Sequence, residues 1–192
     1  MSNYAYVATR ARSRRSRLLP AEAYNQLLNL EHAEIARYIQ DLEYRKEIDR
    51  YGSTLSGADL IETALVDNLA KDVGDFLSFS KGKLRDILHV YAEKYRIENL
   101  KNIVRGINQN MDKQNLERLV CPINDSDKEL YNKLYDSKTV EDMISSLEGT
   151  TYYNPLKKAL ESRNSDSLQP LEDALDLIYY QNLVSNQPSG GA

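Results

Sequence analysis

Apolar residues recur along this chain at the spacing of an α-helix, and this periodicity constrains the fold more than any other feature. Between residues 84 and 95 they stand at i, i+3, i+4, i+7, i+8 and i+11, which places them on one helical face. Three further segments, 60–69, 97–107 and 168–179, carry stripes of the same period. No segment alternates between apolar and polar residues as a half-exposed strand does. The sequence therefore predicts an all-α fold.

Residues that start and stop helices agree with this prediction. Pro20 stands where a helix would begin, because proline lacks the N–H group that the first turn leaves unbonded. Ser126 and Thr139 each precede an acidic residue by three positions, which is the spacing of a capping box, and so predict two helix starts. Gly106 follows the third apolar stripe, where it predicts a C-terminal cap.

The sequence also repeats itself. Tyr-Asn-Gln-Leu at 24–27 recurs as Tyr-Asn-Lys-Leu at 131–134, and Ile-Glu-Thr-Ala-Leu at 61–65 matches Leu-Glu-Asp-Ala-Leu at 171–175. Between these segments, four positions match at a constant offset: Ile35, Ile39, Tyr44 and Ile48 pair with Met143, Leu147, Tyr152 and Leu156. Because the matches keep one order, we interpret them as two copies of a helical unit, each burying an equivalent face.

The repeat and the distribution of charge predict four parts. These are a basic N-terminal helix at 1–20, a first helical module at 21–110, an incomplete second helical module at 111–184, and a flexible tail at 185–192. The first copy continues into the block 97–106, whereas the second ends soon after Tyr179 and Tyr180 with no equivalent block. We therefore expect the second module to expose an apolar side that needs a partner or a further piece of chain.

The start of the chain is strongly basic. Its first twenty residues contain no acid and five arginines, Arg10, Arg12, Arg14, Arg15 and Arg17. The remaining residues carry 20 basic and 29 acidic side chains, so a chain of net charge −4 begins with a segment of +5. Such asymmetry predicts a basic face that binds an acidic partner, a membrane surface or a nucleic acid. A solvent-exposed helix face is the simplest alternative, and an Arg- and Ser-rich, acid-free start is also typical of a transit peptide.

Patterns that carry chemistry are missing from the sequence. It contains no phosphate-binding glycine loop, no His-Glu-x-x-His, no Cys-x-x-Cys and no Gly-x-Ser-x-Gly. We therefore expect no catalytic residue, no cofactor, no metal ion and no small-molecule substrate. Asn99, Asn102 and Arg105 can share one helix face among apolar neighbours, and we interpret them as a polar network that braces helix packing rather than as a ligand site.

A series of short motifs runs along nearly the whole chain in a constant order. It comprises Tyr-Ala-Tyr-Val-Ala-Thr-Arg-Ala-Arg at 4–12 with Leu-Leu at 18–19, Glu-Tyr-Arg-Lys-Glu-Ile at 43–48, the stretch 59–65, Ile-Glu-Asn-Leu-Lys-Asn-Ile-Val-Arg-Gly at 97–106, Gly-Thr-Thr-Tyr-Tyr at 149–153 with Pro-Leu at 155–156, and Leu-Glu-Asp-Ala-Leu-Asp at 171–176 leading to Tyr-Tyr at 179–180. Together these motifs resemble the C subunit of archaeal-type (A-type) and related bacterial V-type ATPases, whose eukaryotic counterpart is the d subunit.

The resemblance implies a funnel-like protein of three similar helical modules, the third of which is missing from this chain. It implies a non-catalytic rotor component of the central stalk, which links the membrane proteolipid ring to the shaft formed by the D and F subunits. Torque would pass through it in proton or sodium transport coupled to ATP. The protein would be cytoplasmic and would meet the membrane only peripherally, with its basic first helix near the ring or its anionic lipids. No nucleic acid is expected, although a small helical nucleic-acid-binding protein that uses the arginine cluster remains the alternative.

Overall fold

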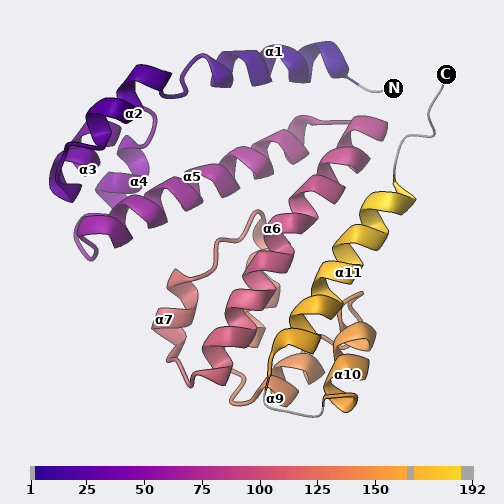
Figure 1. The fold of residues 1–192 in the computed structure, drawn as a ribbon. Helices are drawn as coiled ribbons and strands as arrows, with labels where there is room; N and C mark the ends of the chain where they lie inside the picture. Colours follow the sequence, from indigo (N-terminus) through magenta and orange to yellow (C-terminus); the bar gives the residue numbers. More distant parts are fainter. Residues whose placement is uncertain (1–2, 164–166, 187–192) are drawn as a thin grey trace. The chain divides into compact units, whose positions relative to one another are not determined.

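The computed structural model describes residues 3–163 and 167–186, and these residues form eleven α-helices and no β-strand (Figure 1). The predicted all-α fold is confirmed. The described helices divide into two compact units on either side of the Gly82–Lys83 bond. Each unit has its own buried apolar cluster, so each is described by itself.

In its described part the first unit has five helices: α1 (Tyr4–Arg15), α2 (Ala21–Leu27), α3 (His32–Gln40), α4 (Arg45–Tyr51) and α5 (Gly57–Phe79). The helix α5 packs against α3 and α4. Their shared cluster is small and consists of Ala36, Ile39, Ile48, Leu60 and Ala64. The helix α1 buries only Val7. Its N-terminal end is tied to the far end of α5, because the Asn3 amide donates to the Phe79 carbonyl at 2.7 Å and accepts from the Lys81 N–H at 3.0 Å.

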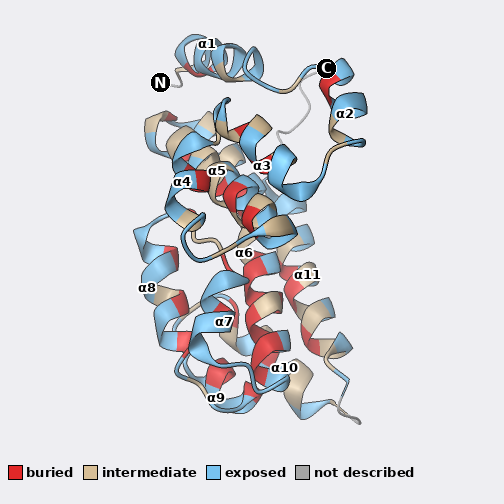
Figure 2. Ribbon diagram, turned by 90° about the vertical axis from the view of Figure 1, so that its left-hand side faces the viewer, coloured by how far each residue is buried: buried red, intermediate tan, exposed pale blue. Residues whose placement is uncertain are grey.

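In its described part the second unit has six helices: α6 (Lys83–Asn108), α7 (Lys113–Arg118), α8 (Asp125–Leu134), α9 (Val140–Ser145), α10 (Tyr153–Glu161) and α11 (Gln169–Ser185). The helices α6 and α11 lie side by side and run antiparallel (Figure 1). The predicted stripes 97–107 and 168–179 line a core that also receives α9 and α10, and Figure 2 shows buried residues along both α6 and α11. This core contains nineteen buried residues, far more than the cluster of the first unit.

The other two predicted stripes are helical but only partly buried. Within 84–95, Ala92 is fully buried, whereas the Tyr91 side chain is 51% exposed. On α5, Leu65 and Leu69 are 38% and 43% exposed. Periodicity therefore predicted where helices form, because an apolar face stabilises them, but it could not predict which faces are covered by neighbours.

The helices recur in the order that the repeat predicts. Those of the first copy, α2 to α5, correspond in sequence order to α8 to α11. The paired residues Tyr44 and Tyr152 both stand immediately before the first residue of a helix, α4 and α10 respectively. Ile48 and Leu156, four positions further on, are 5% and 0% exposed. These two pairs occupy equivalent places in the two copies. The prediction that both copies bury an equivalent face is wrong for α5 and α11, because Leu175 is 0% exposed whereas its counterpart Leu65 is 38% exposed.

The compact units are not the same division as the predicted modules. The predicted module 21–110 includes α6, which packs on α11 in the second compact unit. The modules, defined by sequence repetition, remain a prediction. Of the predicted basic helix 1–20, residues Tyr4–Arg15 are helical, and of the predicted tail 185–192, Ser185 ends α11 while residues 187–192 lie outside the described residues.

Of the four predicted helix boundaries, two are confirmed and two are wrong. Pro20 immediately precedes the first residue of α2. Thr139 caps α9, because its hydroxyl accepts the Asp142 N–H at 3.1 Å. The cap of α8 lies two residues earlier than Ser126, since Asn124 provides it. The helix α6 runs past Gly106 to Asn108.

Gly106 has a packing role inside α6 instead of a capping role. A Cβ atom at this position would lie 2.3 Å from the Cδ2 atom of Leu116, and Leu116 itself is 1% exposed. Glycine is therefore needed because α7 approaches the α6 backbone closely.

We expect Gly106→Ala to lower the free energy of unfolding by about 1–3 kcal/mol through overpacking against Leu116, which outweighs the roughly 1 kcal/mol that alanine adds to helix propensity. Combining it with Leu116→Ala removes the clash, so the double variant should be no less stable than Leu116→Ala alone. Urea denaturation of the three variants measures this, and additive losses would contradict the packing role.

Candidate functional site

The arginines of the predicted basic face differ in what they contact. Arg14 forms ion pairs with both Asp72 and Asp75 of α5. Arg17 pairs with Glu43 at 3.0 Å, in the segment between α3 and α4. These two arginines therefore hold the N-terminal segment against its own unit, and their charges are largely matched there.

The other three arginines of the cluster are exposed residues of α1. Arg10 stacks over the ring of Phe79, with its guanidinium carbon 5.0 Å from the ring centroid. Such a cation–π contact leaves the charge unneutralised. Arg12 and Arg15 are exposed and form no ion pair with any residue in the described ranges. Of the predicted partner-binding residues, Arg12 and Arg15 are thus the two whose charge is directed to solvent.

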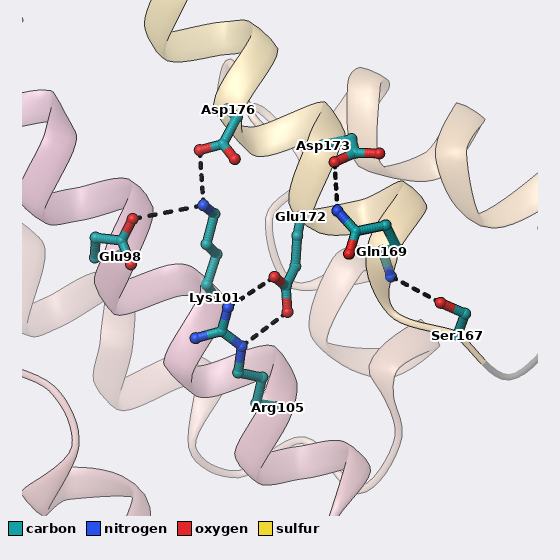
Figure 3. Close-up of polar contacts among 8 residues, drawn as sticks. All are labelled: Glu98, Lys101, Arg105, Ser167, Gln169, Glu172, Asp173 and Asp176. Atoms are coloured by element: carbon teal, nitrogen blue, oxygen red, sulfur yellow. Dashed lines mark hydrogen bonds and ion pairs between the residues drawn. The ribbon is translucent and has the colours of Figure 1, made fainter.

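Ion pairs join α6 to α11 along one side of the second unit (Figure 3). The Arg105 guanidinium donates two hydrogen bonds to the Glu172 carboxylate, at 2.8 and 2.7 Å. One turn away, the Lys101 ammonium lies 2.7 Å from Asp176 and 3.5 Å from Glu98. The hydrogen bonds from Arg105 lower the pKa of Glu172, because they favour its charged form.

Asn99 and Asn102 bind the segment that links α7 to α8. The Asn99 amide donates to the Cys121 carbonyl at 2.8 Å and accepts from the Cys121 N–H at 3.2 Å. Asn102 donates to the Leu119 carbonyl at 3.0 Å. The predicted trio thus contacts two different neighbours, since Arg105 reaches α11 while the asparagines reach this linker. That their role is to brace the packing remains a proposal.

A buried charged cluster lies near the start of the third stripe, and no sequence motif predicted it. The Arg96 guanidinium lies 2.8 Å from Asp127 of α8 and 3.3 Å from Glu93, with all three side chains at most 15% exposed. The Tyr152 hydroxyl donates to Glu93 at 2.6 Å. Burial raises the pKa of Tyr152, so it remains a donor at neutral pH. The three-residue spacing of Glu93 and Arg96 was the one available signal, because the other members come from distant segments.

The described residues offer little that resembles a catalytic or metal site. Within 3–163 and 167–186, no group of three or more His, Cys, Asp or Glu side chains could hold a metal ion. Burial and the nearby Arg96 and Arg85 charges lower the pKa of His89, so this ring is neutral at pH 7. An open groove of about 370 Å³ in the first unit is lined mostly by charged side chains, unlike the apolar pockets that enclose small ligands. Among the described helices, none is both long and apolar enough to cross a membrane.

Comparison with known proteins points to one family. The model of the ATP synthase (C/AC39) subunit family matches residues 7–191. The C subunit of the A-type ATP synthase of Haloferax volcanii is 36% identical over 186 residues, which cover 96% of this chain and 53% of that protein. Its namesake in Archaeoglobus fulgidus is 35% identical (97% and 53% covered), and that in Halobacterium salinarum 34% (100% and 54%). The chain thus spans about half the length of these curated relatives.

The asparagine contacts predict an order of stability losses. Asn99→Ala removes the two hydrogen bonds that Asn99 makes with the half-buried carbonyl and N–H of Cys121 and should cost about 1–3 kcal/mol. Asn102→Ala removes a single, more exposed bond and should cost about 0.5–1 kcal/mol. Equal or negligible losses in urea denaturation would argue against a bracing role.

The Arg105–Glu172 pair predicts a pH-dependent loss. Because the folded-state pKa of Glu172 is lowered, its contribution is complete above the unfolded-state pKa and disappears as pH falls through the folded-state value. Glu172→Gln should therefore destabilise the chain by about 1 kcal/mol at pH 7 and progressively less below about pH 4. Glu148→Gln, at an exposed position, is the matched control and should have little effect at either pH. A loss that does not change with pH would exclude the ion pair as its cause.

Proposed function

The chain belongs to the ATP synthase (C/AC39) subunit family, and we propose that it acts as the C subunit of an A-type rotary ATPase. In this proposal it is a rotor component of the central stalk that links the proteolipid ring to the D–F shaft. It transmits torque in proton or sodium transport coupled to ATP and catalyses no reaction itself. Its place is cytoplasmic and peripheral to the membrane. The similarity of nearly the whole chain to proteins named as the C subunit of A-type ATP synthases carries the proposal.

The packing of the second unit supports a mechanical role. A torque-transmitting protein needs helices that do not slide along one another under load. Leu100, Leu171 and Leu175 are fully buried in the core that α6 and α11 share. The ion pairs of Arg105 and Lys101 join the same two helices beside that core. Apolar burial supplies most of the free energy, and the directional ion pairs set the register of the two helices.

The basic helix supports a contact with an anionic surface. Arg12 and Arg15 lie on α1 with their charges unmatched by any described side chain. We propose that they face the ring or the anionic lipid headgroups around it, where each basic residue adds about 1 kcal/mol of attraction. The proposed contact therefore depends on two of the five clustered arginines.

The same observation weakens the nucleic-acid alternative. Arg14 and Arg17 are engaged by carboxylates of their own unit. Arg10, Arg12 and Arg15, which no carboxylate of the described residues engages, would neutralise about three phosphates, giving a log–log salt slope of roughly −3 on duplex DNA, which is shallow for a dedicated nucleic-acid-binding protein. Retention on DNA or RNA with a steep salt dependence would revive this alternative.

We expect Arg12→Glu/Arg15→Glu to weaken binding of the chain to purified proteolipid ring by at least about tenfold at low salt. The effect should shrink near 0.5 M salt, where charges are screened within about 4 Å. Pull-down against the ring, beside pull-down against the D–F complex, measures both contacts.

The matched control is Lys128→Glu/Lys133→Glu, which makes the same charge change at exposed positions of α8. Unchanged ring binding by the arginine variant, or an equal loss in the control, would reject the proposed role of α1. If the unsubstituted chain binds neither the ring nor the D–F complex, the rotor function itself is rejected.

A further inference from the structure

One side of α5 exposes apolar and acidic residues together. Leu65 and Leu69 are 38% and 43% exposed, although leucine is more often buried. Glu62, one turn before Leu65 on the same side, is exposed and forms no ion pair or hydrogen bond with any described residue. We call Glu62, Leu65 and Leu69 the open face of α5. Their spacing of i, i+3 and i+7 makes this face continuous along the helix.

The internal repeat gives each residue of the open face a counterpart on α11. Residues 61–65 match 171–175 at an offset of 110, so Glu62 corresponds to Glu172 and Leu65 to Leu175, and continuing the register pairs Leu69 with Tyr179. Glu172 binds Arg105 of α6 through two hydrogen bonds (Figure 3). Leu175 is 0% exposed, and Tyr179 packs against the same core. The side of α11 that corresponds to the open face is therefore the side that α6 covers.

We propose that the open face of α5 docks an amphipathic helix of a partner protein, in the way that α11 binds α6. The partner helix presents an arginine to Glu62 and apolar side chains to Leu65 and Leu69. Charge complementarity at Glu62 and the equivalent contact within this chain both specify that chemistry. The inference concerns a different surface from the basic helix and does not depend on contact with the ring.

One difference between the two copies specifies the partner further. Asp176 of α11 forms an ion pair with Lys101, which lies four residues before Arg105 on α6. The repeat counterpart of Asp176 is Val66. A helix suited to α5 therefore carries an apolar residue, rather than a lysine, four positions before its arginine.

The probe is a peptide with the sequence of residues 95–110, in which leucine replaces Lys101. It is held helical by a covalent bridge on its polar side and carries a fluorescent label. Fluorescence anisotropy measures its binding to the whole chain. The probe should bind at least about fivefold more tightly than the same peptide with lysine retained, because a lysine opposite Val66 would be buried without a partner. If the two peptides bind with equal affinity, the partner helix need not carry an apolar residue at that position, and the proposal is overturned.

Charge reversal tests the pairing with Glu62. Glu62→Lys in the chain should weaken binding of the probe by about fivefold or more, and a probe with Arg105→Glu should regain that loss on the Glu62→Lys chain. Glu22→Lys makes the same change at an exposed position of α2 and should leave binding unchanged. Leu69→Asp should weaken binding by about tenfold. Because these side chains are exposed, the thermal unfolding of each variant should match that of the unsubstituted chain.

Other occupants of the open face give different results. If Glu172→Lys weakens binding and Glu62→Lys does not, the peptide is displacing α6 from α11. If Glu62→Lys dissolves a dimer of the chain in sedimentation, the face binds a second copy. If Leu69→Asp abolishes binding to phosphatidylglycerol vesicles while the probe fails to bind, the face meets lipid. Each of these results, or an equal loss with Glu22→Lys, overturns the proposal.

Discussion

The antiparallel contact between α6 and α11 is the interaction on which the second unit depends. Two amphipathic helices that are 75 residues apart in sequence at Lys101 and Asp176 meet along their apolar stripes. Burial of the leucines provides the free energy, but apolar surfaces alone tolerate sliding by one turn. The paired charges beside the contact disfavour such a slip, since it would separate Arg105 from Glu172. Stability and register thus come from different kinds of side chain on the same helices.

The structure shows which of the N-terminal arginines are paired with carboxylates and which are not. In sequence, five arginines form one basic cluster; in the structure they divide by what lies opposite. Arg14 and Arg17 meet carboxylates supplied from 26 to 61 residues later in the chain. A surface ion pair of this kind contributes little stability, yet it removes the charge from long-range attraction. Arg12 and Arg15 retain theirs. Arg10 also keeps its charge but stacks on Phe79, so the proposed contact with an anionic surface rests on Arg12 and Arg15.

How far the sequence predicted this structure depends on the range over which each feature is determined. Helix formation was predictable, since it follows from a period of a few residues, and Thr139 was predictable as a cap because its partner Asp142 is three residues away. The packing role of Gly106 was not predictable, because it depends on Leu116, a side chain of the next helix. The Arg96 cluster was missed for the same reason, as Asp127 and Tyr152 lie 31 residues or more from their partners. The apolar surroundings of Asn99 predicted that it contacts a neighbouring segment, but they did not predict that this segment is the one around Cys121.

The two units differ greatly in how much apolar surface they bury. Nineteen side chains form the described core of one unit and five form the cluster that joins α3, α4 and α5 in the other. Local opening is governed by such differences, because the free energy of exposing a segment scales with what it buries. We therefore expect the chain not to be uniformly stiff, because opening the thinly packed helices α3, α4 and α5 exposes less apolar surface than separating α6 from α11. In a rotating assembly, compliance confined to one part of the chain would smooth the delivery of stepwise motion.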